Sequence, residues 1–203
     1  MKNIRYYINR LGIIQVSLVL LLIGLIFGVL IANLFKNSYI EQIQELESNV
    51  FTSIAVNKIN YSGLFIFTLK KNLKALARFA LLSITILGMP YIIYKVLAFG
   101  FYASFFISVV TINYGFKGII LIMAYVFPHG LIYLPVALLS LYKGFNLCKT
   151  IYFERNNHFD NIFALLKGYI GVFLLLVFAL VIASFIEAYV GAFFLKKALS
   201  LFT

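Results

Sequence analysis

Charged residues are absent from long stretches of this chain, and this feature constrains the fold more than any other. The clearest stretch runs from Leu11 to Phe35 and contains no Asp, Glu, Lys or Arg. A helix of about 20 apolar residues is long enough to cross a hydrocarbon core about 30 Å thick. A signal peptide starts similarly, but its apolar core is only about 7–15 residues long. We therefore predict a retained first membrane-spanning helix over residues 11–35.

The composition extends this conclusion to all 203 residues. Hydrophobic residues make up 64% of the chain, charged residues only 11%, and the mean hydropathy is +1.03. Soluble domains are about 45–50% apolar, so one globular core cannot enclose this much apolar surface. This composition excludes an ordinary cytosolic enzyme and a disordered chain. A disulfide-stapled secreted domain is excluded as well, since Cys148 has no second cysteine to pair with. The predicted fold class is all-α: a polytopic membrane helical bundle with about five transmembrane helices and one amphipathic interfacial helix.

The other apolar runs define four further spans in a single membrane domain, residues 1–203. The second and third spans are expected to form a tight hairpin around Lys95, with Pro90 near its turn. A polar or amphipathic segment follows the first span, and a polar connector precedes the last. The expected spans are 74–94, 96–116, 118–142 and 168–195, the amphipathic segment is 36–73 and the connector is 143–167.

Basic residues outnumber acidic ones by 17 to 6, which gives a net charge of +11. They lie between apolar runs, where each contributes roughly 1 kcal/mol by facing anionic headgroups. Because the chain has no base-stacking motif, we expect the lipid bilayer and not nucleic acid as the partner. Before the second span, basic residues recur on one helical face. They predict an interfacial helix, with a partner-docking helix as the alternative: Lys70, Lys71, Lys74 and Arg78.

Five spans place the two termini on opposite sides of the membrane. With the N-terminus inside, eight basic residues are cytoplasmic and nine are on the other side, so the count does not decide the orientation. The first helix usually dominates, and Lys2, Arg5 and Arg10 closely precede it. We expect a multi-pass protein of the bacterial cytoplasmic membrane with a cytoplasmic N-terminus.

Small residues recur every fourth position in the first span, at Gly24, Gly28 and Ala32. This spacing lets two helix backbones approach closely where lipid offers no hydrophobic driving force. The pattern is typical of helix packing within a bundle, and a homo-oligomer is the alternative.

The fourth span contains Pro128-His129-Gly130 and then Pro135. Each proline removes a backbone donor and crowds the carbonyl four residues earlier, so this helix must kink or unwind near its middle. Two interpretations of His129 stay open. Its neutral imidazole can cap the freed carbonyls as part of a structural hinge, or it can line a cavity as a titratable group.

Glu187 is the only acidic residue inside a predicted span. An ionised carboxylate in hydrocarbon is costly, so Glu187 must stay protonated, reach the interface or pair inside the bundle. Interfacial snorkelling is one alternative, and an interior pair with His129 or with a lysine of a neighbouring span is the other.

Catalytic and metal-binding patterns are absent from the sequence. There is no His/Cys cluster with metal-ligand spacing, no phosphate-binding loop and no nucleophile with an evident base. We therefore expect a noncatalytic protein without a cofactor or a bound metal.

Several of these motifs occur in the order found in a known family. They are the first span with Gly24 and Gly28, the Lys71-Asn72-Leu73 stretch, the Pro128-to-Pro135 stretch and the C-terminal Phe185-Ile186-Glu187. With these features the chain resembles the stage II sporulation protein M family of small five-span membrane proteins. The resemblance implies a noncatalytic component that recruits or organises peptidoglycan-cutting proteins, sporulation proteins D and P, during forespore engulfment.

Two positions depart from the pattern of the sporulation branch, namely Gly130 and the Gly191-Ala192 pair. They leave open a broader branch of the family that accompanies circular bacteriocin production. The alternative function is thus a transporter or an immunity component that moves or binds a peptide, a lipid or an ion. A membrane enzyme acting on lipid headgroups is a third hypothesis.

Overall fold

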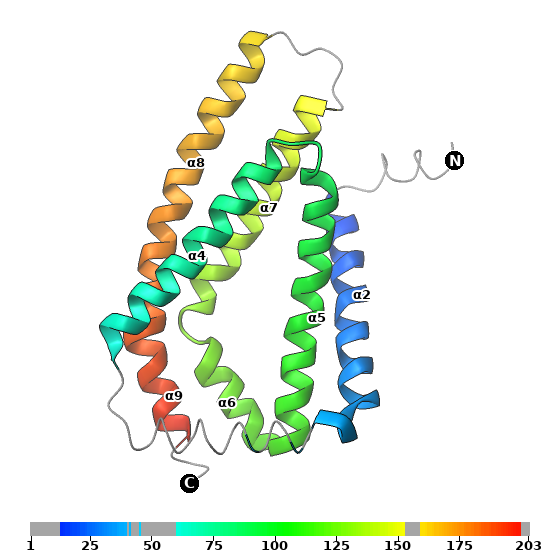
Figure 1. Cartoon of the computed structure of the whole chain (residues 1–203), viewed down its shortest axis with the longest axis vertical. Coiled ribbons are helices and arrows are strands. Elements are labelled where there is room, and N and C mark those ends of the chain that lie inside the picture. Colours follow the sequence, from blue (N-terminus) through cyan, green and yellow to red (C-terminus); the bar gives the residue numbers. More distant parts are fainter. Residues whose placement is uncertain (1–12, 40, 42–44, 46–59, 153–158, 200–203) are drawn as a thin grey trace. The chain divides into compact units, whose positions relative to one another are not determined.

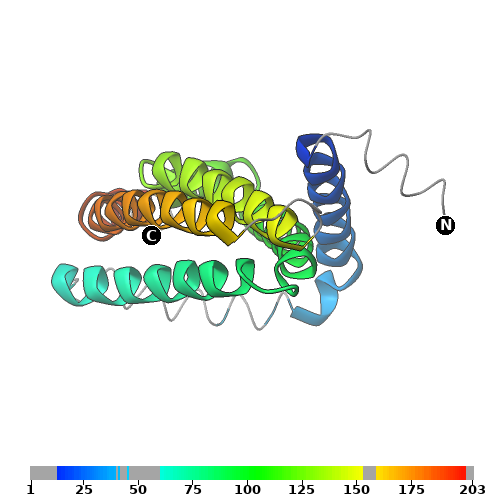
Figure 2. The same cartoon turned by 90° about the horizontal axis from the view of Figure 1, so that it is seen from above.

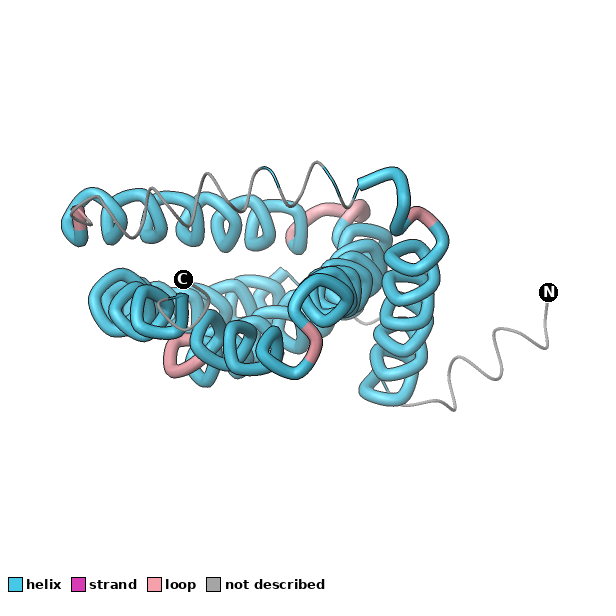
Figure 3. Tube along the Cα trace, turned by 90° about the horizontal axis from the view of Figure 1, so that it is seen from below, coloured by secondary structure: helices cyan, strands magenta, loops and turns pink. Residues whose placement is uncertain are grey.

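The computed structural model describes residues 13–39, 41, 45, 60–152 and 159–199, and within these residues it contains helices and short turns but no strand (Figure 3). Four described stretches are long and apolar enough to cross a membrane, and α6 is a shorter apolar helix. The all-α, multi-pass fold class is confirmed, and about five membrane helices is roughly the right count. The elements in chain order are α2 (Ile13–Leu34), α4 (Tyr61–Ser83), α5 (Gly88–Tyr114), α6 (Phe116–Val126), α7 (Gly130–Tyr152), α8 (Phe159–Ile186), the π-helix η1 (Glu187–Gly191) and α9 (Ala192–Leu199).

The expected turn around Lys95 is wrong, because Lys95 lies inside α5. The turn between α4 and α5 comes earlier, at residues 84–87, where the Thr85 hydroxyl donates to the Leu82 carbonyl at 2.8 Å. Pro90 lies in the first turn of α5, where its missing N–H removes no intrahelical bond. A single lysine does not end a helix, since its apolar stem can lie along the helix surface. The expected span 74–94 therefore covers the end of α4, the turn and the first residues of α5, and the expected span 96–116 covers most of α5.

The expected connector 143–167 is partly helical, because α7 continues to Tyr152 and α8 begins at Phe159, while the last candidate span begins at Leu166, close to the expected residue 168. Polar composition marks where a chain leaves the apolar environment, whereas a helix ends only where its backbone bonding ends. The expected fourth span, 118–142, is divided between α6 and α7. Of the amphipathic segment 36–73, residues 61–73 belong to α4, and most of 40–59 lies outside the described residues.

The chain divides into two compact units, which are described separately. The first is Met1–Leu46 with Ile93–Ile119, and the second is Glu47–Ile92 with Ile120–Thr203. In the first unit α2 lies close to α5: a Cβ atom added to Gly100 would be 2.6 Å from the Leu21 carbonyl oxygen.

In the second unit α4, α7 and α8 pack along one another (Figures 1 and 2). Their shared core consists of Leu76 from α4, Val136 from α7, and Leu176 and Leu180 from α8, all buried. Outward-facing side chains on the same helices are apolar as well, for example Leu131 and Phe178. A surface of this kind fits lipid and not water.

Candidate functional site

The first element of the candidate site is the break between α6 and α7. α6 ends at Val126 and α7 begins at Gly130, and the Phe127–Pro128 peptide bond is cis. The backbone N–H groups of Ile132 and Tyr133 donate to the His129 carbonyl at 3.0 and 3.1 Å, so the helical hydrogen bonding of α7 begins at His129. The expected unwinding at Pro128 is present, whereas Pro135 is accommodated inside α7.

The second element is the π-helix η1, where the ladder between α8 and α9 widens by one residue. The N–H of Ala192 donates to the carbonyl of Glu187, five residues earlier. Such insertions rotate the following side chains relative to a regular α-helix and often occur at functional positions. Glu187 lies at the start of the widened turn and Gly191 at its end. The sequence gives no signal for this feature.

These two irregular elements meet α4 in a hydrogen-bonded network. The hydroxyl of Tyr133 donates to Glu187 Oε2 at 2.6 Å and accepts from the side-chain amide of Asn72 at 2.6 Å. Ser184 Oγ lies 3.2 Å from the Tyr133 hydroxyl and 3.4 Å from Asn72 Nδ2. Ser184 is fully buried, and the other three residues are half-buried. One side chain from α4, one from α7, one from α8 and one from η1 thus form a single cluster, which we call the polar network.

His129 lies beside this network. Its side chain is buried, and its ring makes edge contacts with Tyr125 (centroids 6.3 Å apart) and with Tyr133 (5.6 Å). Nδ1 has no hydrogen-bond partner among the described residues, so this nitrogen caps none of the carbonyls freed by Pro128. A Cβ atom on Gly191 would lie 3.1 Å from the same nitrogen, so the glycine in η1 leaves room for the imidazole.

The geometry places Glu187 toward α7, with Tyr133 as its hydrogen-bond donor rather than His129 or a lysine. A tyrosine hydroxyl can satisfy a carboxylate without adding a second charge to the low-dielectric interior. Hydrogen bonds between membrane helices contribute on average about 0.6 kcal/mol each and at most about 1.7 kcal/mol. Because the hydrogen bonds of the network join α4, α7, α8 and η1, together they can fix the positions of these four elements along one another.

Aromatic side chains flank the network toward the start of α4. The ring of Tyr189 stacks on Tyr61 with centroids 5.7 Å apart and on Phe185 at 4.6 Å. Phe185 also meets the edge of Phe65 at 6.0 Å, and Tyr189 Oη lies 3.4 Å from Ser62 Oγ. These contacts hold the first turn of α4 against η1.

The small-residue positions of the first span lie in the other unit, against α5. A Cβ atom on Gly24 would lie 3.1 Å from Phe101 N, and one on Gly28 would collide with Ser104 Oγ and the Phe101 carbonyl. Ala32 is completely buried, and its carbonyl accepts a hydrogen bond from the Tyr39 hydroxyl. The structure thus uses this stripe for contact within the chain.

The predicted interfacial cations all lie on α4 and are exposed. Arg78 Nε donates to the Lys74 carbonyl at 3.3 Å. The opposite side of α4 is buried and carries Thr68, Leu76, Phe79 and Ser83. Since Lys70, Lys71 and Lys74 point away from the polar network, the structure does not bring them to Glu187.

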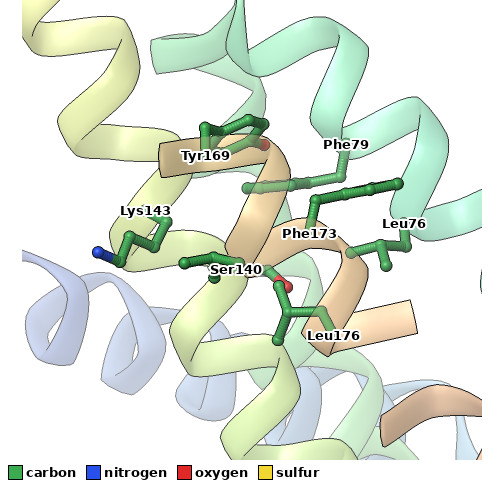
Figure 4. Close-up of a pocket in the computed structure, with 8 residues that line it drawn as sticks. Leu76, Phe79, Ser140, Lys143, Tyr169, Phe173 and Leu176 are labelled. Atoms are coloured by element: carbon green, nitrogen blue, oxygen red, sulfur yellow. The ribbon is translucent and has the colours of Figure 1, made fainter. Parts of the chain in front are cut away.

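A small pocket lies elsewhere between α4, α7 and α8 (Figure 4). Most of its lining is apolar or aromatic, and its polar side chains are Ser140, Lys143 and Tyr169. The lining offers no acidic or imidazole group to act as a base. Within the part of the chain that the structure describes, no group of three or more His, Cys, Asp or Glu side chains could hold a metal ion.

Three members of the polar network were not among the predicted site residues: Asn72, Tyr133 and Ser184. The sequence gives only a weak signal for their role in the network, since each is a single polar residue in an apolar or amphipathic helix. Such residues are common in membrane helices and only become partners when tertiary packing aligns them.

A family model described as Stage II sporulation protein M matches residues 17–191, which includes every residue of the polar network. No curated protein and no solved structure gives a significant match.

Proposed function

Since the chain belongs to the stage II sporulation protein M family, we propose that it is a noncatalytic multi-pass membrane protein that recruits or organises peptidoglycan-remodelling proteins during engulfment. Family membership supports a sporulation-related membrane protein, and the match over residues 17–191 is the observation that carries the proposal. The proposed partners are membrane-associated peptidoglycan hydrolases, sporulation proteins D and P. The proposed orientation has the N-terminus in the cytoplasm.

The arrangement of the second unit is compatible with a scaffold. Its polar network is held by hydrogen bonds between helices, which favours a rigid bundle. Its outward surface offers α4 as a face for other proteins. A scaffold needs such a rigid body with exposed faces, and it needs no reactive group.

The test is deletion of the gene in the bacterium that encodes it, with complementation by the wild-type chain. Engulfment is followed with a membrane dye and the hydrolases with fluorescent tags. The proposal expects engulfment to stop at the septum and the hydrolases to lose their septal localisation. Normal engulfment with normally localised hydrolases would contradict it.

The transporter or bacteriocin-immunity alternative depends on one observation: the Glu187 carboxylate and the His129 imidazole lie beside the break between α6 and α7. Two substitutions separate it from the scaffold, His129→Ala and Glu187→Gln. If the protein is a scaffold, the two substitutions should act only through folding or partner assembly. If it is a transporter, the variants should assemble normally but lose peptide, lipid or proton flux in vesicles.

A further inference from the structure

The imidazole of His129 has a nitrogen that is buried without a partner. Among the described residues, the buried side-chain atoms that lack a hydrogen-bond partner are Nδ1 of His129 and the two amide atoms of Asn113. Leaving such an atom unpaired is unfavourable by about 1–3 kcal/mol. An amide cannot change its set of donors, whereas an imidazole gains a second N–H by taking up one proton. Of these atoms, only Nδ1 belongs to a group that titrates near neutral pH.

The unpaired nitrogen faces η1. A Cβ atom on Gly191 would lie 3.1 Å from Nδ1 and 3.6 Å from Cε1, so this edge of the ring points at the backbone of the widened turn. The Ile186 carbonyl oxygen is 3.7 Å from the same position. Because residue 191 is a glycine, η1 offers Nδ1 no side chain at this point.

Tyr133 connects the imidazole to the carboxylate of Glu187. The rings of Tyr133 and His129 have centroids 5.6 Å apart, and the Tyr133 hydroxyl donates to Glu187 Oε2 at 2.6 Å. Glu187 begins η1 and Gly191 ends it. Since His129 and Tyr133 are one turn apart at the start of α7, the carboxylate and the unpaired nitrogen lie on the side of η1 that packs on α7.

Glu187 is the charged group that faces His129. The titratable neighbours are Tyr125 from α6, Tyr133 from α7 and Glu187 from η1, and Glu187 interacts electrostatically with the imidazole. Tyrosine is neutral at physiological pH. α4 and α8 contribute an amide and a hydroxyl to the adjoining network, and neither titrates. A carboxylate in a low-dielectric interior favours a cation beside it more strongly than it does in water.

A proton fits this position better than a metal ion or a water molecule. Within the part of the chain that the structure describes, no third His, Cys, Asp or Glu joins these two side chains to complete a metal site. Nδ1 is buried, so it has no surface at which a water molecule could bind. A proton adds no volume. In the protonated ring both nitrogens donate, so Nδ1 becomes a donor whichever nitrogen carried the hydrogen before.

We propose that His129 and Glu187 together form a buried proton-binding site between the start of α7 and η1. The proton comes from water and adds to the imidazole nitrogen that lacks one, no other bond forms or breaks, and the negative charge of the pair is neutralised. Glu187 can keep the hydrogen bond from Tyr133, because a carboxylate has two acceptor oxygens. The site goes beyond the proposed function and does not depend on it, since a proton can bind whether or not the protein recruits hydrolases.

The test records the ¹⁵N NMR signals of the imidazole in the full chain in detergent micelles. The chain has two histidines, so the variant His158→Gln leaves His129 as the single labelled imidazole. We expect its ring to pass from one protonated nitrogen to two between about pH 8 and about pH 4. With Glu187→Gln added, the proton affinity of His129 should fall at least about ten-fold, because the amide carries no charge. An imidazole that stays neutral over this range would overturn the proposal, and so would an affinity that Glu187→Gln leaves unchanged.

Two further variants separate charge from folding. Tyr133→Phe removes the hydrogen bond to Glu187 but keeps the carboxylate, so the proton affinity of His129 should not fall. Glu45→Gln is the matched control, since it removes a carboxylate of the first unit, and it should change the affinity by less than about two-fold. If Tyr133→Phe lowers the affinity as much as Glu187→Gln does, the effect comes from loss of the polar network and the proposal is wrong.

Discussion

The phenolic oxygen of Tyr133 contacts groups from three other elements: Asn72 of α4, Ser184 of α8 and Glu187 of η1. It is the only member of the polar network that bonds directly to all the others in the described structure. The hydroxyl both accepts and donates, so one atom satisfies an amide and a carboxylate together. The network depends on this atom more than on the charge of Glu187.

Tyr133→Phe is expected to destabilise the protein by about 1–2 kcal/mol, because it removes the hydroxyl that donates to the Glu187 carboxylate and leaves the Asn72 amide only its 3.4 Å contact with Ser184. The measurement is thermal unfolding in detergent, followed by circular dichroism. Tyr102→Phe is the matched control, since Tyr102 is 63% exposed, and its loss should change stability by less than about 0.5 kcal/mol. Equal effects of the two substitutions would contradict the role of the network.

Joint replacement examines the coupling directly. In a double-mutant cycle, Tyr133→Phe combined with Glu187→Met, which removes the acceptor, should cost less than the sum of the single substitutions, by about 0.5–1.5 kcal/mol. The coupling arises because each single change leaves the same hydrogen bond broken. Strictly additive effects would show that the two side chains act independently.

At the scale of elements, glycines control the contact between α2 and α5. Gly28→Ala is expected to destabilise the protein by about 1–3 kcal/mol, since its Cβ would collide with Ser104 Oγ and with backbone of α5. Gly171→Ala in α8 is the control, because nothing lies within 4 Å of a Cβ there. Unfolding in detergent should show Gly171→Ala as neutral or slightly stabilising. If both alanines behave alike, the close approach of α2 to α5 is not required for stability.

The start of α4 depends on a side-chain cap. The side-chain oxygen Oδ1 of Asn60 accepts from the backbone N–H of Gly63 at 2.9 Å, which satisfies one of the free donors in the first turn. Asn60→Ala should weaken this end by about 1 kcal/mol, whereas Asn60→Asp keeps the acceptor. Hydrogen exchange of the amides of residues 61–64 measures the difference. Unchanged exchange in the alanine variant would show that packing against Tyr189 alone holds this turn.

At the scale of the whole molecule, the chain is a membrane protein whose termini we expect on opposite sides. Four described stretches are long and apolar enough to cross a membrane, and the expected five crossings require one more. Reporter fusions test the resulting topology. Green fluorescent protein should fluoresce when fused to the N-terminus, and alkaline phosphatase should be active when fused to the C-terminus. If the same reporter were active at both termini, the termini would lie on the same side of the membrane, which contradicts an odd number of crossings.

Hydropathy was sufficient to predict the class of the fold but not the order of its turns. Long uncharged runs identify membrane helices because lipid cannot hydrogen-bond a backbone, so the chain must satisfy its own polar groups. The helix break at Pro128 was predictable for a related reason, since proline lacks an N–H. Lys95 was misleading because one charge in an apolar run does not show whether a helix ends there.

The sequence by itself determined the all-α membrane class, the interruption before α7 and the need of Glu187 for a sheltered position, because these follow from solvation and from backbone chemistry. Only the tertiary structure decided that Tyr133, Asn72 and Ser184 meet Glu187, and that η1 widens beside His129. Such partnerships join residues from different helices. They depend on relative rotation and depth, which no local pattern specifies.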